Sequence, residues 1–185
     1  MKKYSLAQLV AIYATYKDLD PKTKIVKCCT CGKTIQINEI EDCFSIWGHY
    51  IARSLAPKLK YHPLNSFAQC IFCNAYSDYT SIQEKYDNYM KYRFGDSIKE
   101  NLLSVEAKDE EYYKNFYTVE LIKLSNKFPE LLDVVVDKNT GEIRNNSLIK
   151  NKIEEQFDTY SPTFKSDLDT LCKCLKTDFI EYNRL

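Results

Sequence analysis

The pattern of apolar and polar positions predicts a helix followed by short strands in the first fifty residues. Apolar side chains recur at helical spacing over residues 5–17, where Ser5 is placed to cap the helix and Asp20-Pro21 to end the segment. Residues 25–53 have a strand-like pattern instead. Its apolar runs are Ile25-Val26, Ile35 to Ile37 and Phe44 to Ile51.

The pattern becomes mainly helical farther along the chain. Residues 54–69 form a connection that contains Pro57 and Pro63, and a helix is expected from Ile71 to about Arg93, with Gly95 as its stop. The residues expected on one face of that helix are Tyr79, Ile82, Tyr86, Tyr89 and Met90.

The last third of the chain predicts further helices and one hairpin. A helix is expected around residues 113–124, a hairpin over 132–143 that turns at Asn139-Thr140-Gly141, and helices that begin at Ser147 and at Ser161-Pro162. The face of the last helix would carry Leu168, Leu171, Cys172, Leu175 and Phe179. We therefore expect an α+β protein in three parts: an N-terminal helix in 1–26, a core in 27–104 and a mainly helical region of unknown role in 105–185.

Composition narrows the class of protein. The 185 residues carry no net charge, but residues 1–75 hold ten Lys/Arg against five Asp/Glu, whereas residues 106–185 hold twelve against sixteen. A surface that meets phosphate would lie in the first part. No apolar run approaches a membrane span, and the N-terminus lacks the apolar stretch of a signal peptide, so a cytoplasmic protein is expected.

Cysteine spacing predicts a structural zinc site. The eight cysteines include Cys28-x-x-Cys31 and Cys70-x-x-Cys73, and two such pairs supply the four thiolates of a tetrahedral zinc site. Cys29 could replace Cys28, although the usual spacing favours Cys28. We interpret the remaining thiols as non-ligands; they include Cys43, Cys172 and Cys174. The alternative is four buried free cysteines.

The polar residues between and beside the cysteine pairs suit phosphodiester hydrolysis. His49 lies at the end of a strand-like run, Asn65 follows sixteen positions later, and Asn74 directly follows Cys73. A neutral imidazole can activate water near pH 7, and an Asn carbonyl suits Mg²⁺ or Mn²⁺. A loop Asn can hold the base rigid. A lone His in a strand is more often a core or surface residue, and only the whole series within a four-cysteine frame favours a catalytic interpretation.

The chain resembles a known nuclease family in these same segments. The matching residues are Cys28-x-x-Cys31, Gly48-His49-Tyr50-Ile51-Ala52-Arg53, Asn65 and Gln69-Cys70-x-x-Cys73-Asn74. They resemble the phage NinG (Rap recombination nuclease) family, within the HNH or ββα-metal nucleases, and also the endonuclease VII-type resolvases. The resemblance covers about residues 27–103, including the helix end at Tyr92-Arg93-Phe94-Gly95. It implies a zinc-stapled ββα-metal core of the treble-clef type.

The resemblance also implies residue roles. His49 would be the general base, Asn65 would brace the hairpin, Asn74 would bind the catalytic Mg²⁺ or Mn²⁺, and Arg53 could hold a phosphate. The chain departs from the HNH pattern at Gly48, where many members have an Asp that is a second metal ligand. That ligand must come from elsewhere or from water. Asp78 could supply a carboxylate, but a helix-surface position is the simpler interpretation.

The sequence therefore predicts a metal-dependent DNA endonuclease. The resemblance to the NinG family implies branched, single-stranded or recombination-intermediate DNA as its substrate and a phage or prophage setting within a bacterial host. Basic side chains that could contact phosphates are Arg53, Lys33 and Lys58, each of which could equally be part of a solvated face. Lys60 follows the predicted base in the same way as Lys58. A resolvase needs two active sites for two strands, which makes a homodimer attractive. The alternative is a non-catalytic zinc module that binds nucleic acid or protein.

Overall fold

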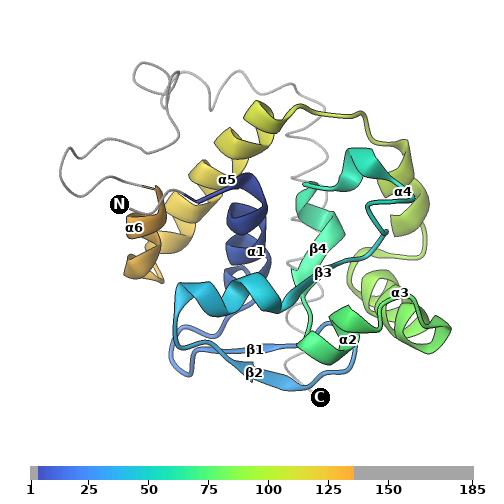
Figure 1. Cartoon of the computed structure of the whole chain (residues 1–185), viewed down its shortest axis with the longest axis horizontal. Helices are drawn as coiled ribbons and strands as arrows, with labels where there is room; N and C mark the ends of the chain where they lie inside the picture. Colours follow the sequence, from blue (N-terminus) through green and yellow to red (C-terminus); the bar gives the residue numbers. More distant parts are fainter. Residues whose placement is uncertain (1–3, 136–185) are drawn as a thin grey trace.

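The computed structural model describes residues 4–135, which form a mixed α+β structure with two small antiparallel sheets (Figure 1). The helices are α1 (Leu6–Tyr16), α2 (Ile71–Ala75), α3 (Thr80–Phe94), α4 (Ile98–Ser104), α5 (Glu110–Ser125) and α6 (Leu132–Val135). The strands are β1 (Ile25–Lys27), β2 (Thr34–Gln36), β3 (Trp47–His49) and β4 (Ser66–Ala68). Short 3-10 turns lie at Ile40–Ser45, Pro57–Leu59, Pro63–Asn65 and Pro129–Leu131.

The larger core forms where α1 packs against α5, which in turn packs against α6. Figure 1 shows α1 and α5 side by side, although about a hundred residues separate them in the chain. Leu9, Ile12, Tyr117 and Leu121 are fully buried there, and Tyr13 meets the ring of Tyr117 edge-on with 5.3 Å between centroids. We call this buried cluster the helical core. It also takes in Cys43 and buried residues of the strand segments, and burial of apolar surface accounts for its cohesion.

A second and smaller core lies under α3 and α4. Tyr86 and Met90 of α3 and Leu102 of α4 pack there against Phe67 of β4 and against Leu59. The end of α3 is tied to the end of α1, because Arg93 donates two hydrogen bonds to the Asp18 carboxylate, at 2.6 and 2.8 Å. This bidentate ion pair fixes α3 relative to the N-terminal helix.

Two antiparallel strand pairs carry the residues between α1 and α2. In the first, Val26 of β1 is opposite Ile35 of β2. In the second, Gly48 of β3 is opposite Phe67 of β4, and His49 is opposite Ser66. The helix α2 follows β4 after two residues, so β3, β4 and α2 form two antiparallel strands and a helix in chain order.

The structure confirms several predicted elements. Ser5 caps α1 in a reciprocal capping box with Gln8, the first two strands lie where the apolar runs indicated, and α5 covers the helix expected around residues 113–124. Gly95 ends α3 with φ +90°, a conformation that glycine adopts without strain.

Four predictions differ from the structure. The run from Phe44 to Ile51 is a 3-10 turn followed by the short strand β3, and the expected connection 54–69 contains β4. The single helix predicted for 71–93 is two helices, because the chain leaves the helix after Ala75. Tyr79 is the exposed residue before α3, at its N-cap position, instead of lying on the buried face of the helix. Residues 132–135, predicted as the start of a hairpin, form the helix α6 with Val134 and Val135 buried in the helical core.

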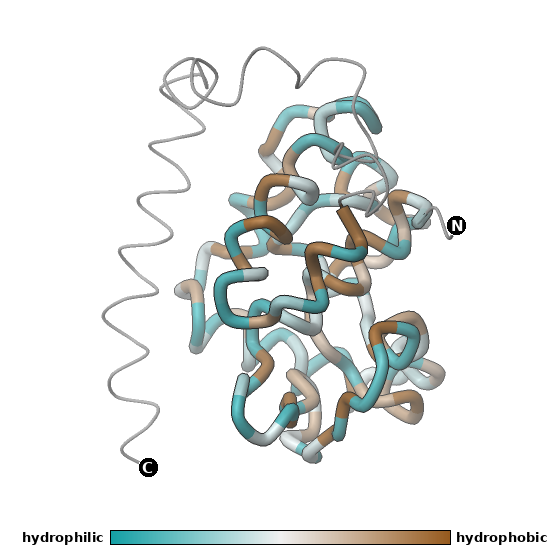
Figure 2. The backbone as a smooth tube through the Cα atoms, turned by 90° about the vertical axis from the view of Figure 1, so that its left-hand side faces the viewer, coloured by the Kyte–Doolittle hydropathy of each residue, from teal (hydrophilic) through white to brown (hydrophobic). Residues whose placement is uncertain are grey.

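Several predictions fall outside the described residues. They are the turn at Asn139-Thr140-Gly141, the helices that begin at Ser147 and Ser161, the final amphipathic helix, and the positions of Cys172 and Cys174. In the part that the structure does describe, no helix is both long enough and apolar enough to cross a membrane. Figure 2 shows apolar and polar residues interspersed along the chain there, without one extended apolar segment.

Candidate metal centre and the cleft beside it

The four cysteines of the two predicted pairs come together in space. The sulfur atoms of Cys28, Cys31, Cys70 and Cys73 all lie within 4.8 Å of one another, and Sγ of Cys31 is 3.8 Å from Sγ of Cys70. Four sulfurs bound about 2.3 Å from one tetrahedral zinc ion would lie about 3.8 Å apart. The group therefore fits a zinc ion in both chemistry and spacing.

Local backbone geometry aims each pair at the same point. The Cys28 amide donates to the Lys33 carbonyl at 2.8 Å, and Gly32, with φ +71°, donates back to the Cys28 carbonyl at 2.9 Å. This tight turn needs a left-handed residue, which glycine supplies. The second pair begins α2, where Cys70 is the N-cap and its sulfur accepts from the Cys73 amide at 3.5 Å. In this second pair a backbone amide thus supports the charge of a sulfur.

The ambiguity between Cys28 and Cys29 is resolved by side-chain direction. Cys28 packs with Cys73 and with Ile82 of α3, which buries this side of the group, whereas Cys31 is exposed. Cys29 points into the smaller core, where burial raises the pKa of its thiol to about 12. Cys43 lies in the helical core, and burial likewise raises its pKa to about 12. Both thiols stay protonated and lie apart from the four-sulfur group.

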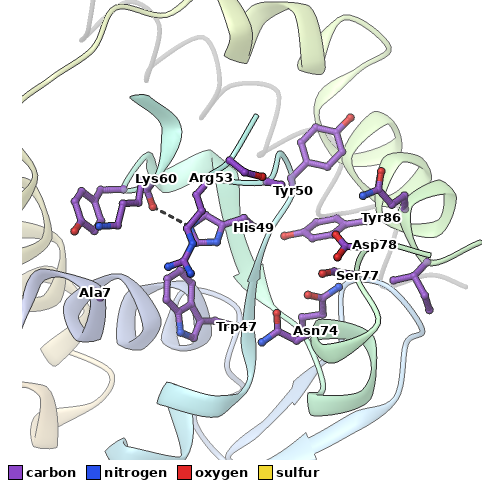
Figure 3. A pocket seen from close by; sticks show the side chains of 16 residues that line it. Ala7, Trp47, His49, Tyr50, Arg53, Lys60, Asn74, Ser77, Asp78 and Tyr86 are labelled. Atoms are coloured by element: carbon purple, nitrogen blue, oxygen red, sulfur yellow. Dashed lines mark hydrogen bonds between the residues drawn. The ribbon is translucent and has the colours of Figure 1, made fainter. Parts of the chain in front are cut away.

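A cleft of about 620 Å³ opens beside the four cysteines. Figure 3 shows His49, Trp47, Arg53 and Lys60 on one side of this cleft, and Asn74, Ser77 and Asp78 on the other. The first side comes from β3 and the loop after it, the second from α2 and the turn before α3. The cleft thus brings the predicted base opposite the predicted metal ligand.

The His49 ring is held by its surroundings. Its Nε2 lies 2.9 Å from the Lys60 carbonyl oxygen, which can only accept, so Nε2 donates the proton. Nδ1 is then the unprotonated nitrogen, and it makes no hydrogen bond within residues 4–135. The Trp47 ring packs at 4.9 Å between centroids. Burial lowers the pKa of His49, and the charges of Arg53 and Lys60 lower it further, so the ring is neutral at pH 7.

Asn65 braces the loop that follows His49. Its side chain is fully buried, its Oδ1 accepts from the Ile51 amide at 2.8 Å, and its Nδ2 donates to the carbonyls of Ile51 and Leu59 at 3.0 and 3.2 Å. Its own carbonyl accepts from the Tyr50 amide at 2.9 Å. One side chain therefore fixes both ends of the segment between Ile51 and Leu59.

The N-terminal helix reaches the same hairpin through Lys17. The Lys17 ammonium donates to the carbonyls of Pro63 and Ser66 at 3.0 and 2.8 Å and lies 3.5 Å from the centre of the Phe67 ring. Burial lowers its pKa to about 7. Tyr86 completes the support from α3, because its hydroxyl donates to the Gly48 carbonyl at 3.0 Å. The hairpin of β3 and β4, which carries His49, is thus held by Lys17 at β4 and by Tyr86 at β3.

Gly48 permits a close approach by the residue before Cys70. A Cβ at position 48 would lie 1.9 Å from Oε1 of Gln69 and 3.2 Å from Oδ1 of Asn74. No side chain fits at position 48 while Gln69 has this conformation. The space that an Asp before the base would need is therefore taken by an amide from the next strand segment.

The three predicted phosphate contacts are placed differently from one another. Arg53 is exposed and lines the cleft beside His49. Lys33 lies in the turn of the first cysteine pair, outside the cleft lining, and Lys58 donates to the Leu103 carbonyl at 2.6 Å. Lys60, which the sequence did not distinguish from Lys58, lines the cleft instead. Of the three, only Arg53 lies beside the predicted base.

Two residues of the cleft could not be assigned a role from the sequence. Gln69 was part of the matching segment and carried no assigned function, although Gly48 was a signal that a neighbour must approach closely. Tyr86 was predicted only as part of an apolar face, and its hydrogen bond to Gly48 depends on the fold.

Comparison of the chain with family models, characterised proteins and solved structures found no match.

Proposed function

We propose that this protein is a metal-dependent DNA endonuclease whose ββα-metal core is stapled by zinc at Cys28, Cys31, Cys70 and Cys73. The observation that carries the proposal is the state of His49. Its Nε2 is committed to a backbone carbonyl, its Nδ1 is unprotonated, and Asn74 faces it across the cleft. A positioned neutral imidazole opposite a hard oxygen donor suits general-base hydrolysis of a phosphodiester.

His49 would take a proton from water at Nδ1. The hydroxide oxygen then forms a bond to phosphorus, the bond from phosphorus to the leaving oxygen breaks, and the leaving oxygen takes a proton from solvent. Mg²⁺ or Mn²⁺ held partly by Asn74 would stabilise the charge that develops on the phosphate. Asn65 keeps the loop after the base rigid, which holds the base within reach of the water.

Basic residues on the open side of the cleft support a nucleic-acid substrate. Arg53 and Lys60 lie beside His49, and both would meet the negative charge of a phosphate. The chain order of β3, β4 and α2 agrees with a ββα-metal core. The resemblance to NinG and endonuclease VII-type nucleases supports branched or recombination-intermediate DNA as the substrate class.

The test is cleavage of labelled duplex, single-stranded and four-way-junction DNA by the purified full chain, with Mg²⁺ or Mn²⁺. Wild type should cut at least one of these substrates. His49→Ala should lower the rate about 10²- to 10⁴-fold and retain zinc. His62→Ala is the matched control, since His62 does not line the cleft and its Nδ1 accepts from the Leu64 amide.

Absence of cleavage of every substrate by the zinc-loaded protein would refute the endonuclease proposal. DNA affinity retained in that case would support a non-catalytic zinc module that binds nucleic acid.

A further inference from the structure

Gln69 lies between the four-cysteine group and the cleft, and its side chain is fully buried. Its Nε2 donates to the Thr30 hydroxyl at 2.8 Å, and its backbone amide donates to the Ile46 carbonyl at 2.6 Å. These two bonds fix the side chain. Its Oε1, in contrast, is buried and accepts no hydrogen bond in the described part of the chain.

A buried amide oxygen without a partner has lost its hydration and gained nothing in return. Such atoms are uncommon in folded proteins, and one that borders a cleft is a candidate ligand for a bound ion. The neighbouring oxygen, Oδ1 of Asn74, is also a hydrogen-bond acceptor and cannot satisfy Gln69 Oε1. A cation can, because it binds two acceptor oxygens at once. The local chemistry therefore presents two hard oxygen donors to the same space.

The two oxygens converge beside Gly48. The position that a Cβ would occupy on Gly48 is 1.9 Å from Gln69 Oε1 and 3.2 Å from Asn74 Oδ1. We propose that Gln69 and Asn74 together hold the divalent cation of the proposed nuclease, with the Gln69 amide in the place where a side chain at position 48 would supply a ligand. This inference rests on the proposed function and adds the second cation ligand to it.

The charge of the site sets how the cation is held. Both amides are neutral, and among the residues that line the cleft within the described chain only Asp78 carries a carboxylate. Mg²⁺ and Mn²⁺ are commonly bound by few protein oxygens together with substrate phosphates. The free protein should therefore bind the cation weakly, and a DNA phosphate in the cleft should tighten that binding.

The test is Mn²⁺ binding to the zinc-loaded full chain, measured from the loss of the free Mn²⁺ paramagnetic resonance signal. It is run with and without duplex DNA, in a His49→Ala background that prevents cleavage. Gln69→Met keeps the length of the side chain without its oxygen and should weaken Mn²⁺ binding about tenfold, whereas Gln69→Glu adds charge and should tighten it about tenfold. Gln83→Met is the matched control, because Gln83 is an exposed Gln of α3 in the same cleft.

Opposite shifts for Gln69→Met and Gln69→Glu, with no shift for Gln83→Met, would support the inference, since a merely structural role would not tighten binding in Gln69→Glu. Equal affinities in all three variants, or no Mn²⁺ binding by the parent protein with DNA present, would overturn it. Mn²⁺ held through Gln69 without DNA cleavage by wild type would overturn the nuclease alone. Cleavage by wild type with Mn²⁺ affinity independent of Gln69 would overturn this inference alone.

A reciprocal exchange tests the same placement if Gln69→Met folds poorly. Gly48→Asp alone should place its side chain against Gln69 Oε1 and lower the unfolding temperature. Gly48→Asp combined with Gln69→Ala vacates that space and should recover both the folding and the Mn²⁺ binding. A double variant that folds but binds no Mn²⁺ would contradict the proposal that Gln69 Oε1 occupies the place of a ligand from position 48.

Discussion

The helical core and the cysteine-bounded segment, residues 28–73, are held together by different kinds of interaction. In the helical core, α1, α5 and α6 bury continuous apolar and aromatic surface. In the cysteine-bounded segment, the strands have three residues each and α2 has five, and buried apolar side chains such as Cys43 and Leu59 belong to the two cores that the helices complete. The cysteine-bounded segment is held by polar groups, which are the four sulfurs, the buried Asn65 amide and the Lys17 ammonium.

This difference explains how a short segment can hold a precise site. Apolar packing is tolerant of small shifts, whereas hydrogen bonds and metal ligands require defined distances and angles. The residues that fix His49 make directional polar contacts, and Lys17 and Tyr86 among them extend from α1 and α3. A change in the helical core should therefore alter stability, and a change in the cysteine-bounded segment should alter the site.

Removal of the metal should have the largest effect. Structural zinc in small domains contributes about 10–16 kcal/mol of apparent binding free energy at pH 7, so Cys73→Ser or chelation should unfold much of residues 28–73. Hydrogen exchange should show loss of amide protection there, with protection retained in α1 and α5. Cys43→Ala, which removes a buried thiol of the helical core, is the control and should keep one zinc per chain. Equal amide protection of residues 28–73 with and without metal would show that this segment does not depend on zinc.

A cavity in the helical core should destabilise the fold and spare the site. Leu9 is fully buried in α1, and Leu9→Ala should lower the free energy of unfolding by about 2–5 kcal/mol. Zinc content and Mn²⁺ affinity should be unchanged at temperatures where the variant is folded. Leu103→Ala, at an exposed position of α4, should cost under about 0.5 kcal/mol in the same urea titration. Loss of zinc in Leu9→Ala would show that the two regions are coupled.

Loss of the Asn65 amide should affect the site more than the stability of the fold, the opposite of Leu9→Ala. Asn65→Ala leaves the Ile51 amide and two carbonyls without their partner, at a cost of about 1–3 kcal/mol. The unfolding free energy should fall by less than in Leu9→Ala, yet DNA cleavage should be lost because the loop after His49 is released. Cleavage at the wild-type rate in Asn65→Ala would refute the bracing role.

Acidification should give the smallest effect. Burial lowers the pKa of His62 from 6.5 to about 4. As the pH falls, the unfolded chain therefore binds this proton before the folded chain does, so stability present above pH 6.5 is lost progressively towards pH 4. His62→Asn keeps a capping side chain and removes the titration, and it should lose about 2 kcal/mol less than wild type between pH 7 and pH 5. Identical losses in urea titrations at the two pH values would contradict this.

The elements that the sequence predicted well are those with local signals. Ser5 with Gln8 marks a helix start, Gly95 marks a helix end, and the Cys-x-x-Cys spacing predicted which four sulfurs gather. Strand β4 has no such signal, because all three of its residues are buried and its pairing with β3 joins residues that are 17 to 21 positions apart. The break between α2 and α3 was also missed, since apolar spacing continued through it.

The candidate site was predicted in its residue types more than in its geometry. His49 and Asn74 were expected to act together, and the structure brings them to one cleft. The Lys60 carbonyl that orients His49, and the Lys17 contact with β4, could not be predicted because backbone acceptors leave no trace in side-chain identity. For the same reason the sequence could not show that Lys60 lines the cleft while Lys58 bonds the Leu103 carbonyl.

The close approach of Gln69 to Gly48 restricts how the sequence can diverge during evolution. Positions 48 and 69 cannot vary independently, since any side chain at 48 collides with Gln69. A lineage that acquires a carboxylate at 48 must first, or at the same time, shorten residue 69. Homologous chains should therefore divide into two groups, one with glycine at 48 and a long amide at 69, and one with an acidic residue at 48 and a small residue at 69.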